Sequence, residues 1–199
     1  MESNNFKDIK IYFIRHGETE ENKKGRIQGR KDFPLNEKGK LQAKQAGQYL
    51  KEHNITFDAI YSSPLTRAYE TASIIKDILK LDLNIQKEFA FIERDFGSSE
   101  GKIVSKENFI PILNDTAEGL EKSYEIQERV YNGLMAILDN TKCKSILIVS
   151  HSHVIKALLT KLDKNLPFST PIVNCALNYF LYDGNNIQII EYNIDPINE

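Results

Sequence analysis

The chain alternates short apolar runs with longer stretches in which apolar residues recur at helical spacing. The runs cover residues 11–14, 57–62 and 145–149, and a helical stretch follows each of them. The run at 145–149 is apolar without alternation, which is typical of a strand buried on both faces of a parallel sheet. This order predicts an α/β fold, namely a three-layer α/β/α sandwich with a mostly parallel central sheet.

The remaining elements fit the same layout. Residues 176–182 and 187–192 flank the turn Asp183-Gly184-Asn185 and predict a C-terminal hairpin that adds an antiparallel edge to the sheet. Residues 84–92 are expected to be extended. The expected helices begin near Asn36, begin at Ser63-Pro64, and cover about 107–113, 120–138 and 152–162. Without a linker or an internal repeat, we expect a single domain over residues 1–199.

Composition and charge narrow the class of protein. The 26 basic and 28 acidic residues leave a formal charge of -2, so we expect no nucleic-acid partner. No apolar run reaches membrane-spanning length and the first residues lack the apolar core of a signal peptide, so we expect no membrane partner and a cytoplasmic location. Cys143 and Cys175 have no motif spacing and suit a reducing compartment as unpaired thiols, while a disulfide between them stays open.

Charged and titratable side chains follow the predicted strands at the points where those strands end. Arg15 and His16 end the first strand, Arg67 lies in the helical turn after the second, and His151 follows the buried strand. Because the carboxyl ends of parallel strands share one edge of the sheet, right-handed crossovers should bring these four residues together. Guanidinium groups grip phosphate oxygens and an imidazole serves as nucleophile or proton carrier, so the pattern predicts a phosphate pocket.

An ordered set of motifs resembles the histidine phosphatase superfamily, the phosphoglycerate-mutase-like fold. The resemblance extends from residue 11 to about residue 162, so it covers most of the chain. The matching positions are Arg15-His16-Gly17-Glu18-Thr19 with Asn22, Gln28-Gly29, Pro34-Leu35-Asn36, Ser62-Ser63-Pro64-Leu65-Thr66-Arg67-Ala68, Glu93 with Phe96-Gly97, Gly101, and Val149-Ser150-His151. The chain departs from the family at Ser152, where a glycine is common, although the Ser152 backbone N–H at a helix start can still face an anion.

The resemblance implies a metal-independent phosphomonoesterase, that is, a histidine acid-type phosphatase that uses no cofactor and acts on a small phosphorylated metabolite. His16 would attack phosphorus and form a phosphohistidine, and Glu93 would protonate the leaving oxygen and then activate water. Arg15, Arg67 and His151 would neutralise the phosphoryl oxygens, and the arginines would replace a metal ion. The expected substrate-binding residues are Asn22, Gln28, Gly29, Ser62 and Ser152.

The roles of these side chains set their protonation states. His16 must be unprotonated to attack phosphorus, whereas a protonated His151 would help to bind a dianion. Glu93 must hold a proton in the first step, so we expect its pKa to be raised by partial burial and by the charge of the phosphate.

Several alternatives stay open at the level of sequence. A cofactor-dependent phosphoglycerate mutase is the main one, but only Arg94 and Arg129 lie between Glu93 and His151, which favours the phosphatase. A metal-dependent hydrolase built on the His151-Ser152-His153 spacing and a non-catalytic binding module are less favoured. Sugar phosphates, nucleotide-like phosphates and phosphoglycerates are all open as substrates, and so is a homodimer.

One region and one residue have no assigned role in the sequence. Phe96, Ile103, Phe109 and Ile110 indicate a partly apolar lid around the 102–118 segment, whose role is open. His153 is expected to be a packing or rim residue.

Overall fold

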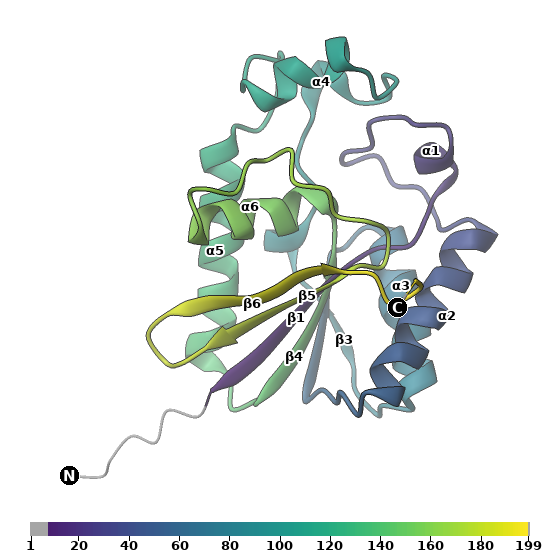
Figure 1. Cartoon of the computed structure of the whole chain (residues 1–199), viewed down its shortest axis with the longest axis vertical. Helices are drawn as coiled ribbons and strands as arrows, with labels where there is room; N and C mark the ends of the chain where they lie inside the picture. The colour runs from purple at the N-terminus through teal and green to yellow at the C-terminus, as the bar shows by residue number, and fades with distance from the viewer. Residues whose placement is uncertain (1–7, 199) are drawn as a thin grey trace.

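A six-stranded mixed sheet forms the centre of the protein (Figure 1). The computed structural model describes residues 8–198. The strand order is β3-β2-β4-β1-β5-β6; the first four strands are parallel, and β5 and β6 add an antiparallel edge. The strands are β1 (Ile9–Arg15), β2 (Ala59–Ser62), β3 (Ile85–Lys87), β4 (Ser145–Ser150), β5 (Leu177–Tyr182) and β6 (Ile187–Ile194).

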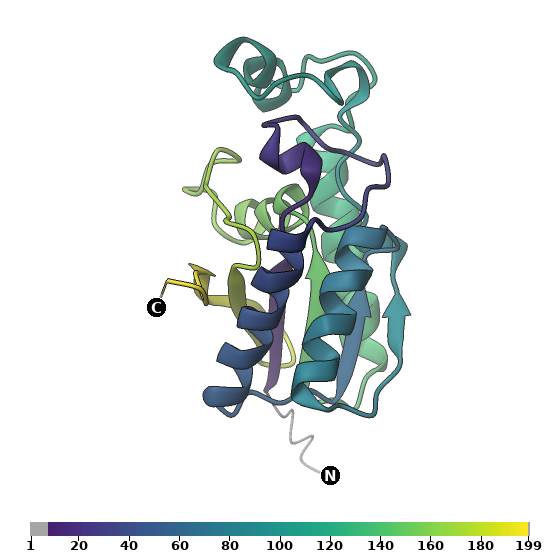
Figure 2. The same ribbon diagram turned by 90° about the vertical axis from the view of Figure 1, so that its right-hand side faces the viewer.

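Helices cover both faces of this sheet, which confirms the predicted three-layer arrangement. In Figures 1 and 2, α2 and α3 lie on one face and α5 and α6 on the other, while α1 and α4 lie beyond the carboxyl ends of the parallel strands. The helices are α1 (Glu20–Lys23), α2 (Glu37–Glu52), α3 (Thr66–Leu79), α4 (Lys106–Leu113), α5 (Ser123–Asn140) and α6 (Ser152–Leu162), with 3₁₀ turns η1 (Phe89–Phe91) and η2 (Gly97–Ser99).

The two central strands are apolar on both faces because each face has its own core. Phe13 of β1 and Ile148 of β4 pack with α5 and α6, whereas Ile14 and Val149 pack with α2 and α3. All four side chains are fully or almost fully buried. The continuous apolar run at 145–149 therefore has the physical cause that the sequence indicated.

The start of α3 differs from the prediction. Ser63 and Pro64 were expected to open this helix, but it begins at Thr66 with Leu65 as the N-cap, which has no side chain for capping. Asp32 supplies the cap from a distant loop, accepting from the Thr66 amide at 2.8 Å and from its hydroxyl at 2.7 Å. A carboxylate at a helix N-terminus satisfies a free amide and interacts favourably with the helix dipole.

Other predicted boundaries shift by a few residues. The long helix starts at Ser123 rather than near residue 120, and the extended stretch at 84–92 becomes the short β3 followed by the turn η1. The loop at 18–34 contains the short helix α1, which Thr19 caps.

The 102–118 segment covers the edge of the sheet formed by the carboxyl ends of the parallel strands. Ile112 of α4 is buried with Ile27, Phe96 and Leu120 in a small third core, whereas Ile103 stays half exposed. Ile112, with Phe109 packed against this core, therefore holds the segment to the α1 loop and to the residues around position 96.

Two sequence-level expectations concern membranes and thiols. Among residues 8–198, no helix combines the length and apolar character needed to cross a bilayer. Cys143 and Cys175 are both free thiols, and Cys175 is buried.

Candidate active site

The register of the sheet brings His16 and His151 side by side. Arg15 pairs with Ser150 in the parallel ladder, and the His16 amide continues it by donating to the Ser150 carbonyl at 2.9 Å. His151 is the next residue after β4, so the two imidazole centroids lie 5.1 Å apart with their planes at 62°. The predicted convergence of these strand ends is therefore present in the structure.

Gly17 and Gly39 let the backbone after His16 touch the first turns of α2. A Cβ on Gly17 would lie 2.4 Å from the Gly39 carbonyl oxygen, and a Cβ on Gly39 would lie 2.1 Å from the Glu18 carbonyl oxygen. Neither glycine is among those with a positive φ, so the need is for close approach of two backbones. This contact fixes the loop that carries His16.

Gly39→Ala should therefore destabilise the protein and lower its activity. The added methyl group meets backbone atoms that cannot rotate away, so we expect a loss of about 2 kcal/mol in the free energy of unfolding. Chemical denaturation measures this loss. Lys44→Ala, on the exposed side of the same helix, is the control and should change stability by less than about 0.5 kcal/mol. Equal stability of the two variants would contradict the conclusion that Gly39 is required for the close approach of the two backbones.

The hydrogen bonds of His16 define its tautomer. Nδ1 lies 2.7 Å from the Gly17 carbonyl oxygen, which can only accept, so Nδ1 carries the proton. Nε2 then holds a lone pair, and it accepts a hydrogen bond from Arg67 Nε at 3.3 Å. Burial and the nearby Arg67 and Arg15 guanidinium groups hold the His16 pKa well below its usual value. The imidazole is therefore neutral and its lone pair is directed at the cationic centre.

Arg67 is a fully buried cation that the surrounding backbone holds in place. It lies in the first turn of α3 and donates to the carbonyls of Lys31 at 3.0 Å and Gly29 at 2.7 Å. Burial lowers its pKa to about 10, and the Glu93 carboxyl acts in the opposite direction. Gly29 thus contributes by orienting Arg67, because its carbonyl is the acceptor.

His151 contacts Ser63, which the sequence analysis placed at the start of a helix and in the family motif without a role at the site. Its Nε2 lies 2.7 Å from the hydroxyl oxygen of Ser63, whereas the Ser62 hydroxyl donates to the Ser63 carbonyl and does not line the pocket. Burial, followed by the Arg67 charge, holds the pKa of His151 well below its usual value. Without a bound anion, neighbouring cations therefore disfavour a second charge on His151. The expected protonated form applies to the phosphate-bound site and stays a prediction.

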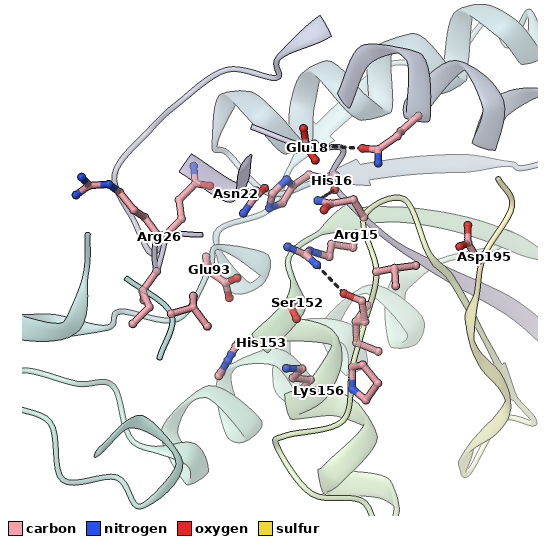
Figure 3. Close-up of a pocket in the computed structure, with 18 of the residues that line it drawn as sticks. Arg15, His16, Glu18, Asn22, Arg26, Glu93, Ser152, His153, Lys156 and Asp195 are labelled. Atoms are coloured by element: carbon pink, nitrogen blue, oxygen red, sulfur yellow. Dashed lines mark hydrogen bonds between the residues drawn. The ribbon is translucent and has the colours of Figure 1, made fainter. Parts of the chain in front are cut away.

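Three polar atoms at this site are buried without a hydrogen-bond partner. They are Arg15 Nε, Gln28 Nε2 and His151 Nδ1; among the described residues only Ser145 Oγ shares this condition. Arg15 is otherwise fixed by a 2.6 Å hydrogen bond to the Ile172 carbonyl (Figure 3). Buried polar atoms without partners are rare, so three of them around one pocket indicate a site for a polar ligand.

Glu93 is a buried carboxyl group beside the cations. Its side chain is 4% exposed and accepts from the Arg94 amide at 2.8 Å. Burial raises the pKa of Glu93, while the amides of Arg94 and His153 and the charges of Arg67 and Arg15 oppose that rise. The direction agrees with the expected raised pKa, and burial is its main cause.

These groups surround an open pocket of about 720 Å³ at the carboxyl ends of the parallel strands (Figure 3). Arg67 and His151 lie beneath its wall rather than on it. The predicted site residues that line it are Arg15, His16, Asn22, Gln28, Glu93 and Ser152. His153 packs against Phe96, with ring centroids 4.9 Å apart, and it also lines the pocket.

Sequence reasoning missed three residues of the site. Ser63 contacts His151, and the Asn174 amide donates to the His16 carbonyl at 2.9 Å from a loop that carried no signal. Lys156 lines the pocket from α6. The sequence does contain a signal for Lys156. It is the one charged residue in the apolar stretch 154–159, which lies in a helix expected to pack on the sheet.

The metal-dependent hydrolase, the less favoured alternative at the level of sequence, has little support in the arrangement of donors. Within residues 8–198, no three His, Cys, Asp or Glu side chains are grouped so that they could hold a metal ion. His16 and His151 instead face two arginines, and these cations repel a divalent metal ion.

Comparison with known proteins identifies the family. The model of the histidine phosphatase superfamily (branch 1) matches residues 11–195. The chain is 34% identical over 187 residues to the uncharacterized phosphatase PhoE of Bacillus subtilis, covering 93% of this chain and 94% of that protein. This chain therefore belongs to the histidine phosphatase superfamily.

Solved structures agree with the fold. A mutant phosphoserine phosphatase from Entamoeba histolytica in complex with phosphoserine superposes with a TM-score of 0.80 at 27% identity, covering 93% of this chain and 96% of that one. Phosphoglycerate mutase from Bacillus anthracis superposes with a TM-score of 0.83 at 24% identity, covering 96% and 95% of the two chains. The fold is thus shared by phosphatases and mutases, and the choice between them depends on the site.

Proposed function

We propose that this protein is a metal-independent phosphomonoesterase, a phosphatase of the histidine acid type, that acts on a small phosphorylated metabolite through a phosphohistidine intermediate. The observation that carries the proposal is the geometry of His16. Its Nδ1 proton is held by the Gly17 carbonyl, and its Nε2 lone pair lies against the Arg67 guanidinium within a pocket that also contains Glu93. A neutral imidazole fixed beside buried positive charge is suited to attack phosphorus.

The reaction follows from these positions in two steps. In the first, His16 Nε2 gives up its hydrogen bond from Arg67 Nε and its lone pair attacks phosphorus, the bond from phosphorus to the ester oxygen breaks, and that oxygen takes the proton from Glu93. In the second, ionised Glu93 removes a proton from water, the water oxygen attacks phosphorus, and the bond from phosphorus to Nε2 breaks. Inorganic phosphate leaves, and both residues return to their starting protonation states.

The remaining groups would bind the phosphoryl oxygens. Arg15 offers its unpartnered Nε, Gln28 its unpartnered Nε2, and the backbone N–H of Ser152 lies at the N-terminus of α6. Arg67 supplies fixed charge from below. Without a bound anion, His151 is a neutral hydrogen-bonding group. Preorganised donors of this kind stabilise the charge of the transition state without reorganisation.

The contacts of Arg94 and Arg129 favour a phosphatase over a mutase, because neither arginine is free to bind a second anionic group of a mutase substrate. Arg94 binds Asp115 and the Glu121 carbonyl, and Arg129 binds Glu121 and the carbonyls of Ala90 and Ile92. Both guanidinium groups are therefore held by the protein itself, and neither lines the pocket. Water is accordingly the proposed acceptor.

Hydrolysis of p-nitrophenyl phosphate tests this function. We expect turnover that is inhibited competitively by vanadate and by inorganic phosphate, because both occupy the phosphoryl site. Prior treatment with a chelator should leave the rate unchanged. Activity that is lost on chelation and restored by zinc would contradict the proposal, and so would the absence of turnover between about pH 5 and 8.

A further inference from the structure

Lys156 is a buried cation that the proposed chemistry does not use. It lies on α6, lines the pocket near Ser152 and His153, and is only 7% exposed (Figure 3). Within the described part of the chain, its amine has no hydrogen bond or ion pair. The amine nitrogen is not among the fully buried atoms that lack a partner in residues 8–198, so it opens onto the pocket. A mostly buried charged side chain without an ion pair still costs free energy, which a bound anion would offset.

The other charged groups of the pocket wall are already engaged. Lys38 pairs with Glu18 at 2.9 Å, and Arg26 faces Glu21 at 3.8 Å. The Asp195 carboxylate accepts from the C-terminal residues 197 and 198. Apart from Glu93, the carboxylates of the pocket wall are therefore engaged by other groups.

The electrostatic surroundings of Lys156 also favour the binding of an anion next to its amine. Burial, followed by the charge of Arg15, lowers its pKa to about 8, and only the Glu93 carboxyl acts in the opposite direction. Burial raises the pKa of Glu93 in turn, and the proposed mechanism assigns this carboxyl group to proton transfer, so it is not a permanent partner for the lysine. An anion bound next to the amine would pair with it and compensate for its burial.

We propose that Lys156 binds a carboxylate on the body of the substrate, so that the substrates are small phosphomonoesters that also carry a carboxylate group. This inference rests on the proposed phosphatase function. Lys156 lies four residues after Ser152 on the same face of α6, which places its Cα about 6 Å further along the helix axis from the N-terminus. Arg15 and the N-terminus of α6 serve the phosphoryl group, and Lys156 serves the part of the substrate beyond it.

A single carboxylate fits this position better than a second phosphate group. A lysine is a point charge with one formal positive charge, whereas protein sites for phosphate dianions commonly use the bidentate fork of an arginine. The cations nearest to Lys156 leave no such fork free, because Arg15 is committed to the phosphoryl site and to the Ile172 carbonyl.

Two phosphate esters of similar shape test the inference. In 3-phosphoglycerate a carboxylate replaces the terminal hydroxymethyl group of glycerol 3-phosphate. Binding of each ester is measured by calorimetry on protein that carries His16→Ala, so that no turnover occurs. The same measurement is made after adding Lys156→Met, which keeps the length of the side chain and removes its charge. Lys161→Met is the control, because Lys161 lies on the same helix and pairs with Glu128.

We expect Lys156→Met to weaken binding of 3-phosphoglycerate by about 10- to 100-fold and that of glycerol 3-phosphate by less than about 3-fold. The Lys161→Met control should change neither. An equal loss for both esters would assign Lys156 to the phosphoryl group and overturn the inference. A loss for neither ester, or no preference for 3-phosphoglycerate before the lysine is changed, would also overturn it.

Hydrolysis of p-nitrophenyl phosphate by the otherwise unaltered protein separates this test from that of the proposed function. If that hydrolysis is absent while the ester preference depends on Lys156, the phosphatase proposal fails and the carboxylate site stands. If hydrolysis is present and the preference is absent, the carboxylate site fails alone.

Discussion

His16→Ala should abolish turnover, with kcat for p-nitrophenyl phosphate reduced by about 10⁵-fold or more, because the nucleophile itself is removed. The remaining cations can bind the ester, but none of them can form the phosphoryl intermediate. His16 follows the last residue of β1 and carries a neutral ring, so its loss should leave the core intact. Steady-state kinetics and circular dichroism together measure the two parts of this prediction.

His53→Ala is the matched control for this variant. His53 is exposed at the end of α2 and hydrogen-bonds to the Tyr49 carbonyl, far from the pocket lining. Its replacement should leave kcat within about 2-fold of the parent value. Residual activity of His16→Ala above about one per cent, in protein with a native spectrum, would remove His16 from the nucleophilic role.

Glu93→Gln should lower kcat for an alkyl phosphate by about 10²- to 10⁴-fold, the usual contribution of general acid–base catalysis. The amide oxygen can still accept from the Arg94 backbone, so the loop should keep its position. The amide cannot deliver a proton to the leaving oxygen, nor can it take one from water. The variant separates these two roles when the leaving group is changed.

A leaving group of low pKa needs no proton in the first step. With 2,4-dinitrophenyl phosphate, Glu93→Gln should therefore release about one equivalent of phenolate per active site in a rapid burst, followed by slow turnover. Stopped-flow absorbance measures the burst. If the variant instead loses activity equally with alkyl and dinitrophenyl esters and shows no burst, Glu93 is not the acid and base of this reaction.

The convergence of the site was predictable because it depends on strand ends and sheet topology. The apolar runs located β1, β2 and β4, and parallel pairing then placed His16, Arg67 and His151 at one edge. The register explains why Ser63, rather than the predicted Ser62, contacts His151. Ser62 pairs with Val149 within the sheet, so Ser63 is the residue that emerges next to His151. A shift of one residue in the register moves a side chain to the other face of the sheet, and sequence alone does not define the register.

Sequence patterns could not predict the properties that depend on contacts between residues far apart in the chain. The cap of α3 comes from Asp32, which lies in an irregular loop more than 30 residues away in the chain. The protonation state of His151 depends on burial beside Arg67, and neither burial depth nor distance appears in the order of residues. Lys156 was visible as a charge within an apolar helix face, but its meaning required the pocket.

Trapping of the phosphoenzyme tests the central claim most directly. The protein is mixed with a ³²P-labelled phosphomonoester, quenched within milliseconds in alkali, and digested for mass spectrometry. The account predicts a phosphoryl group on His16 Nε2 that is stable in alkali and labile in acid, and that accumulates further in Glu93→Gln. Label on another residue, or hydrolysis of the ester without any covalent label under conditions where Glu93→Gln turns over slowly, would contradict it.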